Sequence, residues 1–411
     1  MPSTPERADR DRAVWRDLVE HHFDRDFLLS SLEQFIRTPT DPEPGQTQVA
    51  PDDPKVARFV HEVLRPRLRM IGATDHLVDA WNNVIIRRGT GTAGGLYLST
   101  YCVVHHGNRM PDPYSGCVAN GKQLGFDEDC VFGRGASESK GPLAAALTAL
   151  KVVIDAGVAL TRPLTWALST EGRSSHFSTS KIIDGQGVRA DGGILCIGTG
   201  GMITLGNRGR VDILVTIKGK SSHSSQPWLA RNAIEGGLEA VRRLKAIPMP
   251  KSHPHLGPEQ LTVYKFICSP IAPHTIPDTC EITVDRRLLP GSEPAAAVEE
   301  ARVALDGMAP FDVIAKEGVV MYPADVSPDA AVVAALRGAH RAVTGRDADM
   351  GHVMWTFDAG YPCRAGIPTV CYGPATAPTA GSDPLGTDFV TVRHLEEAAK
   401  TYAMTMLSML T

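Results

Sequence analysis

The sequence lacks the features that mark membrane-spanning, exported or nucleic-acid-binding proteins. It has no run of about 18 apolar residues, so we expect no membrane-spanning helix. Its 42 Lys and Arg residues face 46 Asp and Glu residues, and a net charge of −4 argues against a nucleic-acid partner. The N-terminal residues MPSTPER contain no apolar signal core, so we expect a cytoplasmic protein.

Paired cysteines, internal repeats and low-complexity segments are also missing. The eight cysteines are scattered without a C-x-x-C pair, and a chain of 411 residues needs no disulfides to hold a core. We therefore expect reduced thiols, most of them buried as small apolar side chains. A hydrophobic fraction of 43 % and a charged fraction of 21 % are typical of a globular chain with two or three domains.

The order of apolar patterns predicts an α/β fold with an inserted domain. Residues 1–208 alternate apolar strands with helices, including a long Ala- and Leu-rich helix at 140–156, which indicates a mostly parallel sheet between helices. Residues 209–322 instead combine antiparallel strand patterns with two helices, which predicts a smaller α+β domain. Residues 323–411 return to the first pattern and complete the first domain.

Four separated stretches resemble one enzyme family. Residues 132–141 (FGRGASESKG) resemble its G-R-G-x-x-D-x-K-G motif, and residues 219–234 contain a G-x-x-x-H-x-x-x-P…N-A-I match. Residues 276–290 resemble I-P-D…D-x-R-x-x-P, and residues 356–374 resemble T-D-A…G-I-P…G-P. The family is that of the dinuclear zinc peptidases and deacylases, which includes acetylornithine deacetylase, succinyl-diaminopimelate desuccinylase, aminoacylase and carboxypeptidase G. Together the matches span most of the chain.

The resemblance implies a zinc-binding catalytic domain and an inserted lid domain that also forms a homodimer. A pair of zinc ions needs about five His or carboxylate ligands. Aligned with the family, this chain has Thr100 where the first His ligand stands and Glu138 where the bridging Asp stands. The family's next acidic ligand falls near residues 197–199, which hold no carboxylate, and its last His falls on Asp383-Pro384. We therefore expect no zinc cofactor from the family's own ligand set.

A rebuilt metal site has a few candidate ligands near the same motifs, listed here: Cys102, His105, His106, Glu138, His176 and Asp383. A mononuclear site that uses Cys102 with one of the histidines is conceivable. The adjacent histidines 105 and 106 would point to opposite faces of an extended segment. We favour the simpler interpretation that they are loop residues.

Three residues of the first domain are candidates for catalysis. Glu138 follows the glycine-rich turn, and its alternative role is to stabilise a helix N-terminus. Glu171 follows the apolar strand 164–168, at the end of a strand where ligands bind in open α/β sheets. The alignment makes Glu171 either the catalytic base or a former zinc ligand. Cys102 is either a nucleophile or a buried, inert thiol.

The inserted domain supplies the other candidates. In the family, the histidine that aligns with His223 polarises the scissile carbonyl, so His223 is a catalytic candidate. Asn232, Arg287 and His274 align with positions linked to substrate binding, and Thr100 joins them from the first domain. Their alternative roles include a helix cap for Asn232 and a local salt bridge for Arg287.

Two classes of function fit this pattern, and ordinary zinc hydrolysis ranks third. The first is a metal-independent enzyme that acts on a small amino-acid derivative bearing a carboxylate, by C–N bond cleavage, acyl transfer, cyclisation or proton transfer. The second is a non-catalytic binding protein or a partner of an active homologue. We favour the enzyme, because the polar pocket positions are replaced without bulky apolar residues and the lid motif is intact.

Overall fold

The computed structural model describes residues 5–43, 46, 49–50, 52–92, 94–105, 110–172, 174–374 and 387–411. The chain divides into two compact units. Unit 1 contains residues 1–206, 325–351 and 361–411, and unit 2 contains residues 207–324 and 352–360. No helix in the described part is both long and apolar enough to cross a bilayer.

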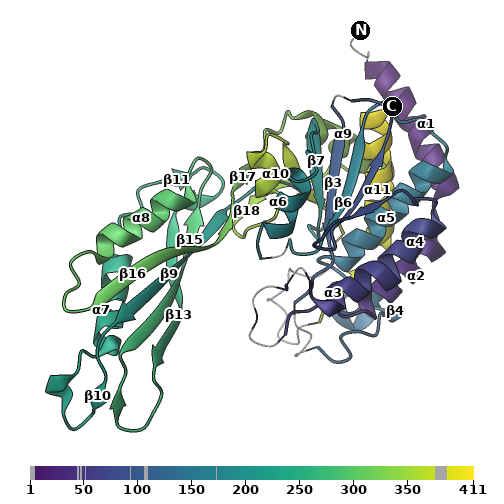
Figure 1. The fold of residues 1–411 in the computed structure, drawn as a ribbon. Coiled ribbons are helices and arrows are strands. Elements are labelled where there is room, and N and C mark those ends of the chain that lie inside the picture. The colour runs from purple at the N-terminus through teal and green to yellow at the C-terminus, as the bar shows by residue number, and fades with distance from the viewer. Residues whose placement is uncertain are drawn as a thin grey trace. The chain divides into compact units, whose positions relative to one another are not determined.

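Unit 1 is built on a mixed sheet, drawn in Figure 1. Its strands lie in the order β1 (Leu77–Val78), β2 (Val84–Arg88), β6 (Leu164–Ser169), β3 (Leu96–Tyr101), β7 (Gly192–Cys196), β19 (Thr369–Tyr372), β8 (Ile203–Asn207) and β17 (Ala324–Asp325), and β18 (Met350–Val353) also pairs with β8. The four central strands β6, β3, β7 and β19 are parallel. Antiparallel pairs flank them, as β2 against β6 and β8 against β19 show. The predicted parallel layer is therefore the centre of a mixed sheet.

Helices cover both faces of this sheet. Their bounds are α1 (Pro5–His22), α2 (Arg25–Ile36), α3 (Pro54–Arg58), a π-helical segment (Phe59–Leu64), α4 (Arg65–Met70), α5 (Lys140–Asp155), α6 (Phe177–Ile183), α9 (Ala331–Thr344), α10 (Gly360–Arg364) and α11 (Val392–Leu410). Alternate residues of β3 separate the two cores: Leu98 packs with α5 and α11, whereas Tyr97 packs with α6. Helix α5 is buried along almost its whole length, which explains its Ala- and Leu-rich sequence.

Unit 1 also has a smaller sheet of three strands, β4 (Val118–Asn120), β5 (Asp129–Phe132) and β20 (Phe389–Thr391). In sequence, β5 precedes α5 and β20 precedes α11. Strand β5 ends where the glycine-rich turn begins, and β20 ends where α11 begins. The register pairs Phe132 with Phe389. The residues on either side of this pair are therefore held together, and one of them, Asp388, supports the candidate site described below.

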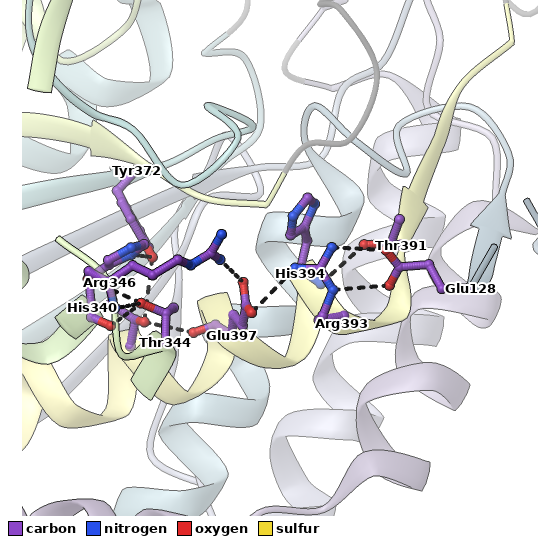
Figure 2. A network of polar contacts seen from close by, with 10 residues as sticks. Glu128, His340, Thr344, Arg346, Tyr372, Thr391, Arg393, His394 and Glu397 are labelled. Carbon is purple, nitrogen blue, oxygen red and sulfur yellow. Dashed lines mark hydrogen bonds and ion pairs between the residues drawn. The ribbon is translucent and has the colours of Figure 1, made fainter. Parts of the chain in front are cut away.

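The C-terminal helix is joined to its neighbours by a polar network, shown in Figure 2. The His340 Nδ1 atom of α9 lies 2.7 Å from the hydroxyl of Tyr372, which ends β19. On α11, a carboxylate oxygen of Glu397 lies 3.8 Å from Arg346 and another lies 3.5 Å from Arg393. The network ties the last strand of the parallel group to two helices that are distant in sequence from it.

Unit 2 is an antiparallel sheet with two helices. Its strand order is β13 (Gln260–Ser269), β15 (Thr279–Leu288), β9 (Gly209–Lys218) and β16 (Asp312–Met321), with α7 (Ala233–Lys245) and α8 (Pro294–Leu305) packed on one face. Unit 2 also contains a short antiparallel strand pair, β10 (Ser222–His223) with β14 (Thr275–Ile276), and a short hairpin, β11 (Ser252–His253) with β12 (Gly257–Pro258). Residues 352–360 join this unit although they follow the predicted domain end at 322.

Candidate functional site

The candidate residues of unit 1 gather at the carboxyl ends of its parallel strands. Thr100 lies within β3 and Cys102 follows it, Glu171 follows β6, and residues 197–199 follow β7. Parallel strands that pair in register end at the same edge, which is where ligands bind in open α/β sheets. The backbone N–H of Gly198 donates to the carbonyl oxygen of Glu138 at 3.1 Å, so the start of α5 meets the same edge.

A strained turn positions Glu138. Gly135 has a φ of +90°, and a Cβ atom there would lie 2.6 Å from a Val104 methyl carbon, so only glycine fits. The carboxylate of Asp388 accepts hydrogen bonds from the N–H of Gly135 at 2.7 Å and from the N–H and hydroxyl of Ser137 at 3.0 and 2.9 Å. Asp388 therefore fixes the turn from which Glu138 projects.

Glu138 faces two protonatable side chains. The hydroxyl of Tyr101 donates to Glu138 Oε1 at 3.1 Å, and His105 Nε2 lies 3.7 Å from Glu138 Oε2. The Glu138 side chain is 25 % exposed and that of His105 is 47 % exposed, so both remain in contact with solvent. Tyr101 itself is buried. The three groups form an acid–base cluster that a small molecule could reach.

Glu171 lies in different surroundings. It is 2 % exposed, and its carboxylate accepts hydrogen bonds from the N–H of Val49 at 3.2 Å and of Ser174 at 2.9 Å. Its own N–H donates to the hydroxyl of Ser178 at 3.1 Å. Backbone N–H groups stabilise the ionised form of a carboxylate, and these contacts hold two separate segments of the chain against β6. The geometry therefore favours a role for Glu171 in shaping the site.

Thr100 and Cys102 are both buried. The hydroxyl of Thr100 donates to the carbonyl oxygen of Ala167 at 3.0 Å, which engages it within the sheet. Burial raises the pKa of the Cys102 thiol to about 12, and the nearby Lys140 opposes this shift only in part. A thiol with such a pKa is almost entirely protonated at neutral pH, so it is a poor nucleophile. These surroundings favour the inert interpretation of Cys102.

The candidate histidines of unit 2, His223 and His274, lie at the short strand pair of β10 and β14. His223 in β10 pairs with Thr275 in β14, and the rings of His223 and His274 stack with centroids 5.9 Å apart. His274 has a φ of +55°, a left-handed conformation that is uncommon for a histidine. The hydroxyl of Ser225 lies 2.8 Å from Nδ1 of His223. Both residues are exposed, so this strand pair can present their rings to another molecule.

Asn232 and Arg287 make the local contacts expected from their alternative roles, a helix cap and a local salt bridge. Asn232 caps α7, because its side-chain oxygen accepts from the N–H of Ile234 at 3.1 Å. Arg287 lies 2.9 Å from a carboxylate oxygen of Asp285 and donates to the hydroxyl of Thr356 at 3.0 Å. These contacts fix both side chains and leave a substrate-binding role for them as a prediction.

Comparisons with known proteins cover both units. Residues 205–312 match the family model M20_dimer, described as "Peptidase dimerisation domain". The chain is 26% identical to the uncharacterized protein YgeY of Escherichia coli in an alignment of 377 residues that covers 86% of this chain and 90% of that protein. It is 25% identical to a succinyl-diaminopimelate desuccinylase of Caulobacter vibrioides over 309 residues, which cover 71% of this chain and 76% of that enzyme.

Solved structures show the same fold. An M20 family metallo-carboxypeptidase, Sso-CP2 from Sulfolobus solfataricus, superposes with a TM-score of 0.73 at 16% identity, over 92% of this chain and 98% of that one. Human carnosine dipeptidase 1 gives a TM-score of 0.71 at 14% identity, over 97% and 98% of the two chains. The chain therefore has the fold of M20 peptidase structures, and its residues 205–312 match a peptidase dimerisation domain.

The zinc pair expected of an M20 peptidase does not fit the described residues. No group of three or more His, Cys, Asp or Glu side chains in the described part of the chain is arranged to hold a metal ion. The donor set explains this: Thr100 offers a hydroxyl already bonded to a carbonyl, and residues 197–199 offer no carboxylate. His106 and Asp383, two candidates for a rebuilt site, lie outside the described residues.

Two residues of this site were not singled out from the sequence. Tyr101 is the last residue of β3, between Thr100, which aligns with a zinc-ligand histidine of the family, and Cys102, which aligns with the aspartate that orients it. Asp388 was noted only as part of the motif that follows the lost histidine. The sequence did offer a signal for each residue: Tyr101 ends a central strand, and Asp388 follows the segment that aligns with the family's last histidine ligand.

Proposed function

We propose that this protein acts on a small amino-acid derivative bearing a carboxylate without a zinc pair, using Glu138 as its acid–base group. The observation that carries the proposal is the cluster of Glu138, Tyr101 and His105 at the carboxyl edge of the parallel strands. A partly exposed carboxylate between a phenol and an imidazole can accept a proton from a substrate and return it.

The chemistry open to such a cluster is limited by what the residues can polarise. A general acid–base pair alone stabilises a transition state less than a metal ion that polarises the carbonyl group. Proton transfer, cyclisation or C–N cleavage of an activated substrate therefore fit better than hydrolysis of an unactivated amide. Acyl transfer through Cys102 fits poorly, because burial holds the pKa of that thiol near 12.

The substrate class rests on the relatives. One relative is named a succinyl-diaminopimelate desuccinylase, which indicates an N-acylated amino acid as its substrate. N-acyl and N-succinyl amino acids, including N-trifluoroacetyl derivatives whose amide is activated, are therefore the first compounds to test on this chain. The family resemblance assigns His223 to stabilising negative charge on the substrate, and Arg287, Asn232 and His274 to binding it; these roles of unit 2 residues stay predictions.

A non-catalytic binding protein is the second candidate, and one observation favours it. Thr100 and Glu171 align with metal-site residues of the family, but here their side chains form hydrogen bonds with backbone groups of this chain. A site whose former catalytic positions have become structural could still bind a ligand. In that case a substrate-like compound would raise the melting temperature without being converted.

Turnover by matched variants tests the proposal. The wild type, Glu138→Gln and Tyr101→Phe would be incubated with a panel of N-acyl and N-succinyl amino acids, and products followed by mass spectrometry. We expect turnover by the wild type, a loss of 100-fold or more in Glu138→Gln and a smaller loss in Tyr101→Phe. Arg58→Gln, on the exposed surface of α3, is the control.

The outcomes separate the two candidates. Product formation that survives in Glu138→Gln would remove Glu138 from the mechanism. Thermal stabilisation of the wild type by a compound that is never converted would favour the binding protein instead. Elemental analysis of the same samples accompanies both measurements, so that adventitious metal activity is recognised.

A further inference from the structure

A cavity lined by arginines lies between α1 and α9 in unit 1. Its volume is about 600 Å³, and Arg12 and Arg16 on α1 face Arg337 and Arg341 on α9. Among the lining residues that the structure describes, Asp347 is the one acidic residue, so four positive charges meet one negative charge there. The whole chain has a net charge of −4, and this local excess of +3 is therefore unusual within it.

The rest of the lining consists of small residues. They are Ala13 on α1 and Ala334, Gly338 and Ala342 on α9. A Cβ atom at Gly338 would lie 3.5 Å from the Cδ atom of Arg12, so the arginine stem lies across this glycine. Small residues at these positions keep the space between the two helices open. A volume of this size accommodates a small molecule.

Three of the arginines, Arg16, Arg337 and Arg341, are available to a ligand. Arg337 makes no hydrogen bond or ion pair with any residue that the structure describes, and its side chain is exposed. Arg16 lies 3.4 Å from Asp17, and Arg341 lies 3.6 Å from Asp347, in pairs whose members are all at least half exposed. Exposed ion pairs of this kind contribute little free energy, so an anion can displace them at small cost.

We propose that this cavity, the α1–α9 arginine cleft, binds a small, multiply charged oxyanion. Guanidinium groups bind phosphate and carboxylate oxygens in a bidentate manner, and arginines from two helices can hold separate anionic groups of one ligand. The excess of positive charge favours a ligand with several negative charges over a monoanion. The cleft lies on helices of unit 1 that contribute no residue to the Glu138 site, and its ligand is independent of the proposed catalysis.

Two kinds of variant separate charge from shape. Arg16→Gln/Arg337→Gln removes two of the four charges, whereas Gly338→Leu fills the cavity and leaves every charge in place. Gly338→Ala is the matched control, because its Cβ would make only an ordinary contact with Arg12. Alanine and leucine both favour a helix more than glycine does, so α9 should remain folded in both variants. Arg58→Gln, on α3, controls for the loss of an exposed arginine.

Calorimetric titration of the full chain at low salt with pyrophosphate, citrate and acetate tests the cleft. We expect pyrophosphate or citrate to bind saturably and at least tenfold more tightly than acetate, and the comparison of the two identifies phosphate or carboxylate as the preferred group. Binding should weaken about tenfold or more in Arg16→Gln/Arg337→Gln and in Gly338→Leu, and remain in Gly338→Ala and Arg58→Gln. The absence of saturable binding by either polyanion, or equal binding by all five proteins, would overturn the proposal.

Discussion

At the scale of single residues, Glu138 and Glu171 lie at the same edge of the sheet but have different environments. Glu138 is partly exposed between Tyr101 and His105, whereas Glu171 is buried and accepts two backbone N–H groups. A carboxylate of the first kind can exchange protons with a ligand. One of the second kind mainly holds chain segments in place.

The two carboxylates should respond differently to the same substitution. Glu171→Gln replaces one oxygen by an amide nitrogen that faces a backbone N–H, which leaves a buried donor unsatisfied. We expect it to lower the free energy of unfolding by about 1–3 kcal/mol, and Glu138→Gln to change it by less than about 1 kcal/mol. Urea unfolding followed by circular dichroism measures both. Equal losses in the two variants would argue against the structural role of Glu171.

Cys102 should be unreactive in the folded protein. Burial raises the pKa of its thiol to about 12, so the thiolate that reacts with iodoacetamide is scarce at pH 8. Cys117 is exposed and serves as the internal control. Peptide mapping by mass spectrometry should show alkylation of Cys117 within minutes and of Cys102 only after denaturation. Rapid alkylation of Cys102 in the native protein would revive the nucleophile interpretation.

At the scale of elements, the sequence predicts the long segments well and their long-range partners poorly. The helix predicted at 140–156 is observed at Lys140–Asp155, because a run of buried Ala and Leu residues identifies it locally. Val49 is 122 residues from Glu171 and nothing in the sequence indicates that the two meet. The surroundings that decide the role of Glu171 therefore could not be predicted from local pattern.

The same limit applies to Asn232, whose two candidate roles can be separated on α7. Asn232→Ala removes the cap and should lower the free energy of unfolding by about 1 kcal/mol, while Asn232→Asp keeps the oxygen that caps Ile234 and should have little effect. If Asn232 also binds substrate through its amide N–H groups, turnover falls in both variants. Loss of turnover in Asn232→Ala alone would assign the residue to the cap only.

The network of α9, β19 and α11 in Figure 2 should make stability depend on pH. Burial lowers the pKa of His340, and burial together with Arg393 lowers the pKa of His394, from the ordinary value of 6.5. The unfolded chain therefore binds more protons than the folded chain as the pH falls below about 6.5. The contribution of the two neutral histidines to the free energy of unfolding is complete above that pH. It is lost as the pH falls through the lowered pKa of each histidine.

Melting temperatures at pH 7.5 and 5.5 check this sign. The wild type should melt at a lower temperature at pH 5.5, and His340→Gln should show a smaller difference between the two conditions because it cannot be protonated. His61→Gln is a suitable control, since this histidine is on the surface. A drop of the same size in wild type and His340→Gln would show that His340 contributes nothing to the acid sensitivity.

At the scale of the whole molecule, the match to a peptidase dimerisation domain indicates assembly into a homodimer through unit 2. Helix α7 presents Leu238, 62 % exposed, and Ile234 on its surface, and the edge strand β13 exposes Phe266 and Ile267. An apolar helix face beside an unpaired strand edge is suited to burial against a second copy. Residues 352–360, which unit 2 also contains, were not foreseen because their sequence carries no domain signal.

Light scattering coupled to size-exclusion chromatography tests the dimer. We expect the wild type to elute with twice the mass of one 44.1 kDa chain, and Leu238→Glu to shift it toward the mass of one chain. Val303→Glu on α8 is the control, because Val303 is similarly exposed on the other helix of unit 2. A monomeric wild type would contradict the assignment.

The proposal that the chain holds no zinc pair is tested most directly by the metal content of the intact chain. The protein would be incubated with excess zinc, dialysed without chelator and measured by inductively coupled plasma mass spectrometry beside its Glu138→Gln variant. Because the described donor set does not fit a zinc pair, we expect well under one zinc ion per chain in both proteins. A content of about two zinc ions in the wild type, reduced in Glu138→Gln, would contradict the proposal and show that this chain holds a metal pair.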